Sequence, residues 1–163
     1  MTIKFFRNKV VEVEPQSPTE LLVSWRLTDD LVRLDVKLTI QIPEMEIMEA
    51  EASSGRFPGQ NCIDVDEKIK MIEGVPIGAG LRKIVNGVLG GEEGCDLLID
   101  AVLESANAII LHFTRPGIQI MESLTEPEQK IEALQAMLKA NPKLVRSCIS
   151  FQDESPIMQG LEL

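Results

Sequence analysis

The chain has 163 residues, and its 26 acidic residues outnumber its 16 lysines and arginines, which gives a formal net charge of −10. This length fits one domain, and a hydrophobic content of 44% with a mean hydropathy of +0.05 excludes a disordered chain. The negative charge disfavours nucleic acid and anionic membrane surfaces as partners, because both are bound through lysine and arginine.

Neither the N-terminal segment nor the cysteine content indicates export from the cytoplasm. Residues 1–15 carry a charge every few positions, whereas a signal peptide needs a continuous apolar region. The longest uncharged stretch, Ser105–Thr114, has about half of the roughly 20 residues that cross a bilayer. The 3 cysteines include no Cys-x-x-Cys pair, which disfavours zinc ribbons and thioredoxin-like redox sites. We therefore expect a cytoplasmic protein with reduced thiols.

The first third of the chain shows the period-two alternation of antiparallel strands. Apolar and polar residues alternate without a break over 32–42, and a second alternating run covers 21–28. A preceding strand around Val11 and Val13 and a returning strand over 47–52 complete the set, with turn residues between them. The pattern predicts a meander of about four strands, with one apolar face, within residues 1–55.

Beyond residue 55 the apolar period becomes that of helices. A capping-box pattern at Asp64 and Glu67 predicts a first helix that ends at Gly74. An apolar stripe over 81–88 predicts a second helix, which a pair of glycines ends.

Two further helices are expected toward the C-terminus. One runs from about residue 95 to residue 113 and is ended by the pair Pro116-Gly117. The other opens with a second capping-box pattern, Thr125 to Glu128, and ends before Pro142. Periodicity does not decide the conformation of residues 142–163.

A sheet with one apolar face must be covered, and each predicted helix has one apolar stripe with which to cover it. The expected fold is therefore a two-layer α+β domain, with the sheet in 1–55, the helices in 60–151 and a tail in 152–163. With no linker or repeat in the sequence, we expect one domain over 1–163.

The glycine-rich run GVPIGAGLR, at 74–82, suggests an anion-binding turn. A helix N-terminus attracts anions, so Gly78 and Gly80 with the Arg82 side chain would supply the donors. The run lacks the spacing of a phosphate loop or a dinucleotide-binding motif, and it follows a helix and not a strand. The alternative is a tight turn between helices in which glycine adopts a positive φ.

Cys95 stands at the expected start of the long helix, where the positive end of the helix dipole favours a thiolate. The acidic neighbours Glu92, Glu93 and Asp96 act in the opposite direction. His112, the only histidine, lies roughly 25 Å from Cys95 if one helix carries both, which excludes a Cys/His dyad. The alternative role of Cys95 is that of a small apolar residue at a crowded helix start.

The run GVPIGAGLRKIVNGVLGGEEGCDLL, at 74–98, is similar to the signature of a bacterial domain-of-unknown-function family, number twenty-eight eighty-nine. Its members have strands first, then a cysteine, a G-x-x-I-x-x-G stretch that enters a helix, a Gly-Gly-x-x-Gly-Cys block and often a C-terminal cysteine. The matching residues, spread over nearly the whole chain, are Cys62, Gly74, Ile77, Gly80, Arg82, Gly90, Gly91, Gly94, Cys95 and Cys148. The family usually has Gly-Cys-Thr-His-Leu, and here Leu97 stands in the histidine position. The family has no established activity, so this resemblance implies a fold and leaves the function open.

In architecture the chain also resembles, more weakly, iron–sulfur scaffold and sulfur-acceptor proteins, which use three thiolates and an acid. That resemblance implies Cys62 and Cys95 as two of the ligands. No cysteine in the strand region matches the remaining thiolate.

The leading interpretation is an uncharacterised cytoplasmic bacterial protein that serves as a non-catalytic module and binds a protein partner, a ligand or itself, without a cofactor. The alternative is a thiol-based carrier or scaffold for a metal, an iron–sulfur cluster or sulfur. It would use Cys62 and Cys95, assisted by Cys148 or a carboxylate, and requires the first two sulfurs to lie within about 4 Å. An enzyme acting on a small acid or a thioester is a third interpretation, for which no residue set is assigned. The ligand, the partner and the oligomeric state do not follow from the sequence.

Overall fold

A computed structural model of the chain describes residues 4–55, 64–146 and 149–161. By their internal contacts the residues form two compact units, unit 1 over Met1–Ile110 and unit 2 over Leu111–Leu163. Unit 1 holds the sheet with the helices that cover it, and unit 2 holds the C-terminal helical part. The single domain expected over 1–163 stays a prediction.

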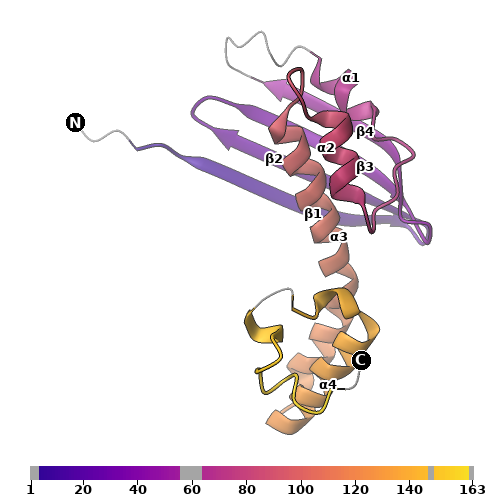
Figure 1. Cartoon of the computed structure of the whole chain (residues 1–163), viewed down its shortest axis with the longest axis vertical. Helices are drawn as coiled ribbons and strands as arrows, with labels where there is room; N and C mark the ends of the chain where they lie inside the picture. Colours follow the sequence, from indigo (N-terminus) through magenta and orange to yellow (C-terminus); the bar gives the residue numbers. More distant parts are fainter. Residues whose placement is uncertain (1–3, 56–63, 147–148, 162–163) are drawn as a thin grey trace. The chain divides into compact units, whose positions relative to one another are not determined.

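Unit 1 contains one antiparallel sheet of four strands, in the order β1-β2-β3-β4 (Figure 1). The strands are β1 (Arg7–Ser17), β2 (Glu20–Asp29), β3 (Arg33–Gln41) and β4 (Glu46–Gly55). Each strand pairs with the next one along the chain. The predicted four-stranded meander is confirmed, and β1 is longer than the segment around Val11 and Val13 that the alternation marked.

One face of this sheet is buried and the other is largely exposed. In the two central strands every second side chain is fully buried, which is the alternation that the sequence showed. The buried positions are Leu21, Val23, Trp25 and Leu27 in β2 and Leu34, Val36, Leu38 and Ile40 in β3.

Helices cover the buried face, and together they enclose one hydrophobic core (Figure 1). They are α1 (Val65–Lys70), α2 (Leu81–Leu89) and the first part of α3 (Asp96–Ser123). Their core residues are Val65, Ile69, Leu81, Val85, Leu89, Leu98, Ala101, Val102, Ala106 and Ile109. The expected two-layer α+β arrangement is confirmed.

Both predicted capping boxes are absent, although the helices begin close to the expected positions. Asp64 is the N-cap of α1 and makes no side-chain cap hydrogen bond. The N-cap of α4 (Pro127–Ala140) is Glu126, which also makes none. Pro127 in the first turn favours the start of α4, and burial of Val65 and Ile69 stabilises α1.

The predicted end of the long helix at Pro116 is wrong, because α3 continues through this proline to Ser123. Pro116 lacks the amide that would bond to the carbonyl of His112, a loss that costs about 3 kcal/mol in a helix interior. Packing in unit 2 offsets that cost. A Cβ placed on Gly117 would lie 3.8 Å from Met137 Cγ of α4, so the two helices pack closely there.

Of the described helices, α3 is the one that is long and apolar enough to cross a membrane by length and composition. Its most apolar window of 18 residues has a mean hydropathy of 1.4, and 39% of that window is buried. A core helix of a soluble protein passes the same criterion, and α3 contributes to the core of unit 1. Length and composition are therefore weak evidence for a span.

Unit 2 consists of the end of α3, α4 and a C-terminal segment with short 3-10 turns at Pro142–Leu144 and Ile149–Phe151. The side chain of Gln135 in α4 donates to the carbonyls of Ile157 and Gln159, both at 3.0 Å. These bonds hold the tail against α4, in the part of the chain for which periodicity was undecided.

Candidate functional site

Of the predicted thiol ligands, Cys95 lies in the described part of the chain, whereas Cys62 and Cys148 lie outside it. Cys95 is a free, half-buried thiol that packs against the core. Its amide donates to the Leu89 carbonyl at 2.8 Å, and its carbonyl accepts from the Ile99 amide at the start of α3. Within the described ranges, no group of three or more His, Cys, Asp or Glu residues is placed to hold a metal ion. The three-thiol site stays a prediction.

The glycine block before Cys95 brings backbone close to backbone within the turn that joins α2 to α3. A Cβ on Gly90 would lie 2.4 Å from the carbonyl oxygen of Asn86, and a Cβ on Gly94 would lie 2.4 Å from the carbonyl carbon of Gly90. Gly91 has a φ of +88°. Side chains do not fit at these contacts or readily adopt this φ, so all three positions favour glycine. Backbone packing is a sufficient reason for the block.

The predicted anion-binding turn leads into α2 as expected. Gly80 is the N-cap residue of α2 and has a φ of +89°, which matches the alternative of a tight turn that needs a positive φ. Open space surrounds Gly78, and Arg82 is exposed. Arg82 lines a hollow of about 470 Å³ together with Asp100 and Glu104 of α3. Two carboxylates beside one guanidinium oppose the entry of an anion, and anion binding here stays a prediction.

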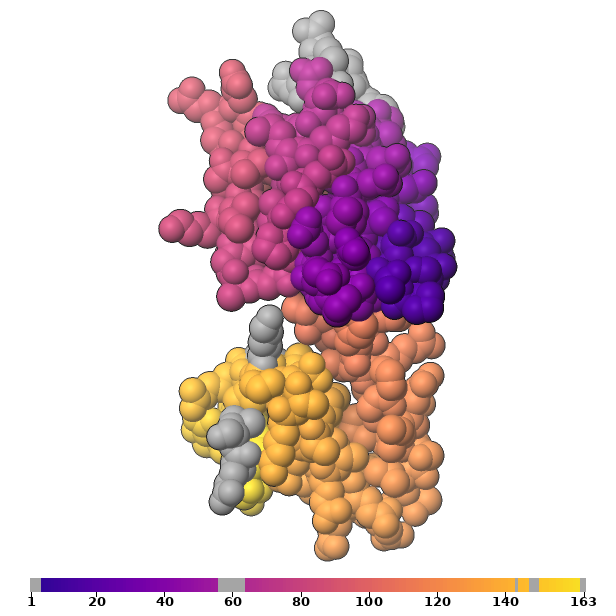
Figure 2. Space-filling model, turned by 90° about the vertical axis from the view of Figure 1, so that its right-hand side faces the viewer, coloured from indigo at the N-terminus to yellow at the C-terminus, as the bar shows by residue number. Residues whose placement is uncertain are grey.

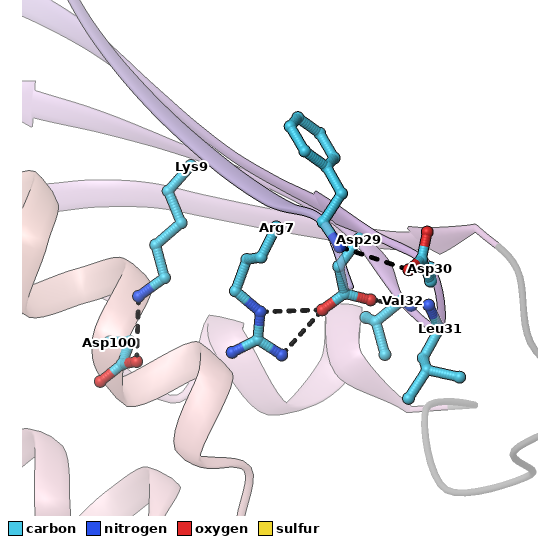
Figure 3. A network of polar contacts seen from close by, with 8 residues as sticks. Arg7, Lys9, Asp29, Asp30, Leu31, Val32 and Asp100 are labelled. Carbon is cyan, nitrogen blue, oxygen red and sulfur yellow. Dashed lines mark hydrogen bonds and ion pairs between the residues drawn. The ribbon is translucent and has the colours of Figure 1, made fainter. Parts of the chain in front are cut away.

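A cluster of charges joins β1 to α3 on the buried side of the sheet. Lys9 Nζ lies 3.3 Å from Asp100 Oδ2 (Figure 3). It also lies 2.9 Å from Glu104 Oε1 and 5.8 Å from the centroid of the Trp25 ring. The indole Nε1 of Trp25 donates to Glu104 Oε2 at 2.5 Å. The hydrogen bond from Lys9 to Glu104, helped by Asp100, raises the pKa of Lys9. The Lys9 side chain is therefore held on the helix-covered face of the sheet and does not extend from the β1 edge.

A second polar group secures the turn between β2 and β3 to the start of β1. Arg7 Nη2 lies 2.7 Å from Asp29 Oδ2, and Asp29 Oδ1 accepts from the amides of Leu31 and Val32 (Figure 3). Burial opposes ionisation of Asp29, but these amides and Arg7 outweigh it and lower the pKa of the carboxyl group. The arrangement is that of a structural anchor.

The direction of the backbone amides shows how the two edges of the sheet differ. The Asp29 amide donates to the Val32 carbonyl at 2.9 Å, so these residues form a hydrogen-bonded pair of β2 and β3. Because hydrogen-bonding direction alternates along an antiparallel strand, the odd-numbered residues of β2 bond to β3 and the even-numbered ones bond to β1. With the observed register, the odd-numbered residues of β1 point their amides and carbonyls away from the sheet.

The edge formed by β4 is capped by the chain that follows it. The alternating direction of hydrogen bonding places the amides of Ala50 and Ala52 on the outer side of β4. The Ala50 amide donates to Glu73 Oε1 at 3.1 Å, and the Ala52 amide donates to Asp66 Oδ1 at 3.2 Å. The pKa of Asp66 is lowered, mainly by the hydrogen bond from Lys70 and next by the hydrogen bond from the Ala52 amide.

Past a register shift between Thr39 and Ile40, the outward residue of β4 is Ile47. Its amide donates to the Val75 carbonyl at 3.1 Å, and its carbonyl accepts from Gly74 at 2.8 Å. Backbone and side chains of the α1 region thus close the β4 edge.

The edge formed by β1 has no such cap among the described residues. The outward amides are those of Arg7, Lys9, Val11 and Val13, while Pro15, the next outward residue, has no amide hydrogen. Side chains along β1 are mostly exposed, and atoms of this N-terminal region, coloured indigo, lie at the surface of unit 1 (Figure 2). This open strand edge is the strongest candidate for a binding site in unit 1.

Unit 2 has a groove of about 320 Å³ between its part of α3 and α4. Phe113, Gly117 and Ile120 line it from α3, and Ala133 and Met137 line it from α4. The groove is apolar and open, and nothing in the structure indicates what would cover it.

Sequence reasoning missed the open edge because the alternation located β1 only at Val11 and Val13. The signal was present, since Lys9, Val11, Val13 and Pro15 occupy every second position and face the helices. A lysine at the first of these positions hid the pattern. The acidic partners of Lys9 on α3 are known only from the fold.

Comparisons with known proteins place the chain in a family. No curated protein and no solved structure matches it, and the likeness to iron–sulfur scaffold proteins stays a prediction. The model of a family described as "Protein of unknown function (DUF2889)" matches residues 23–111. The matched segment holds most of β2, then β3, β4, α1, α2 and the first part of α3, and it is shorter than the nearly whole chain that the resemblance implied. Because this match covers more than half of the sequence, the chain belongs to the DUF2889 family, as its glycine and cysteine motifs indicated.

Proposed function

We propose that the protein is a non-catalytic binding module that holds an extended protein segment against the open β1 edge. One observation carries the proposal. The β4 edge of the sheet is closed at Ile47, Ala50 and Ala52, whereas β1 directs a row of amides and carbonyls to solvent. An extended segment binds such a row as an added strand, with main-chain hydrogen bonds for affinity and side-chain contacts for selectivity.

The side chains of β1 determine which side chains the added segment needs on each face. On the buried side of the sheet, Val11 and Val13 are half-buried and extend the core toward the edge. On the exposed side, Glu12 and Glu14 form no ion pair within the described ranges. A segment with apolar residues on the face of Val11 and Val13, and with basic or uncharged residues on the face of Glu12 and Glu14, satisfies both faces.

A capped peptide that alternates lysine and valine, as long as Arg7–Val13, provides the probe. Added to dilute isotope-labelled protein, it should shift the amide resonances of Lys9, Val11 and Val13 and slow their hydrogen exchange. The resonances of β4 should not move, because α1 and its following turn already bond that edge.

The matched variants are Val13→Pro and Val13→Ala, which remove similar side-chain contacts. Proline also removes the outward amide of residue 13 without removing a hydrogen bond to β2. The peptide should bind Val13→Ala and lose at least about tenfold in affinity for Val13→Pro, which lacks one main-chain donor. Equal binding to both variants, or shifts outside β1, would contradict the proposal.

A further inference from the structure

We infer that the segment bound at the open edge is β1 of a second copy of this chain, paired antiparallel about a two-fold axis at Val10. This inference rests on the proposed function and names the partner. It follows from the self-complementarity of β1 in its hydrogen bonds and its apolar side chains, and the charges of β1 do not oppose it.

Hydrogen bonding is complete in this register. With Val10 on the axis, Arg7 pairs with Val13 of the second copy and Lys9 pairs with Val11 of the second copy. Every outward amide from Arg7 to Val13 then meets an outward carbonyl. Pro15, which has no amide hydrogen to donate, falls beyond these hydrogen-bonded pairs. Moving the axis to Val11 would pair Arg7 with Pro15 and leave the Arg7 carbonyl of each copy without a donor.

The exposed apolar side chains select the same register. Val10 is 36% exposed on the outer face, and it would lie opposite its own copy in a non-hydrogen-bonded pair, where side chains are closest. Phe5, which is 59% exposed, would lie opposite Pro15 of the second copy. With the axis at Val11, Val10 would instead face a glutamate.

The charges of β1 permit the pairing. Antiparallel pairing about Val10 places Glu12 opposite Asn8 of the second copy, so an amide faces each carboxylate and like charges are not opposed. An inward-facing lysine on an edge strand ordinarily opposes pairing, because its ammonium group has no partner. Here Asp100 and Glu104 hold the Lys9 ammonium under the sheet. β1 also keeps an unbroken register from Arg7 to Pro15, with no bulge to twist the edge away.

Light scattering on the whole protein tests for the dimer. At concentrations above roughly micromolar, the range expected for one strand pair, the wild type should have twice the mass of the 18.1 kDa chain. Val13→Ala should remain a dimer, and Val13→Pro should raise the dissociation constant at least about tenfold. Circular dichroism establishes that each variant is folded.

Cysteine cross-linking tests the register and does not depend on proline. Val10→Cys should form a disulfide-linked dimer under mild oxidation, because the two thiols face each other across the axis. Glu12→Cys, which would face Asn8, should cross-link much less, and the wild type controls for the native cysteines. Equal cross-linking of both variants would overturn the register.

The outcomes also separate this inference from the proposed function. A wild type that is monomeric over the same concentrations, but binds the lysine–valine peptide at β1, overturns the self-pairing and leaves the binding module. A monomer that binds no peptide overturns both. A dimer that survives Val13→Pro uses another surface and overturns the inference.

Discussion

Replacing Glu73 with alanine tests the account of the closed edge most directly. Glu73 lies in the turn after α1, so the change removes a side chain without altering the interior of a helix. The side chain of Glu73 is exposed, and its Oε1 accepts the Ala50 amide at 3.1 Å. The effect of Glu73→Ala should therefore come from that hydrogen bond.

The magnitude follows from the burial of Ala50, which is 1% exposed. A buried amide that loses its acceptor costs about 1–3 kcal/mol, because its desolvation is then no longer compensated by a hydrogen bond. With a urea dependence of about 2 kcal/mol per molar, the unfolding midpoint should fall by about 0.5–1.5 M. Glu73→Gln keeps an oxygen acceptor and should lose about 1 kcal/mol or less.

Urea unfolding followed by tryptophan fluorescence measures this change in unit 1. Trp25 is the only tryptophan, and it is buried in that unit beside Glu104. Its signal therefore reports on the sheet, whatever happens in unit 2. If Glu73→Ala unfolds at the wild-type midpoint, or if Glu73→Gln costs as much as alanine, the hydrogen bond does not close the edge and the contrast with β1 fails.

The pKa of Asp29 is lowered in the folded protein, so its contribution to stability is complete above the ordinary value of 3.8 and is lost as the pH falls through the lowered one. Asp29→Asn should therefore be less stable than the wild type at neutral pH and should lose less stability on acidification. Urea titrations at several pH values measure both effects. The prediction is wrong if the unfolding free energies of the two proteins fall by equal amounts on acidification. Gly94→Ala should lower the urea midpoint strongly, because its Cβ would lie 2.4 Å from backbone, whereas Gly78→Ala, with open space around it, should change it little. If the thiols form a metal or cluster site, protein purified without oxygen should contain stoichiometric iron or zinc that Cys95→Ser loses; metal-free, colourless wild type would contradict that alternative.

The sequence predicted the elements well wherever apolar residues had a clear period. The alternation in 21–28 and 32–42 reports burial on one face, and in the fold those residues are the core. The glycine turns before α2 and α3 were also predictable, since glycine permits the backbone conformations found there.

Local motifs predicted helix starts and ends less well where long-range contacts compete with local ones. Asp64 and Glu67 have capping-box spacing, yet the neighbouring Asp66 is the carboxylate that matters, and it bonds to Ala52 in the sheet. Pro116 likewise has a local preference to end a helix, which packing against α4 overrides. Long-range contacts decide both cases, and no window of the sequence contains them.

The open edge belongs to a third category, because it depends on the direction of the backbone and not on the type of side chain. Whether Val11 points its amide toward β2 or toward solvent follows from the bond between Asp29 and Val32, which sets the phase of the whole sheet. Shifting the turn between β2 and β3 by one residue would reverse that phase. Composition and periodicity therefore do not predict the direction of these amides.

The family match and the proposed site rest on different parts of the chain. The match begins at Val23, after β1, and its motifs include Gly90 and Gly94, which the fold explains by close backbone packing within the turn that joins α2 to α3. Membership therefore supports the scaffold from β2 to α3 and adds no weight to a role for β1. The case for β1 rests on its outward amides, on the neutralised charge of Lys9 and on a register that completes the hydrogen bonds and that the apolar contacts select. A cross-link through Val10→Cys tests the register, and Val13→Pro tests the outward amides separately.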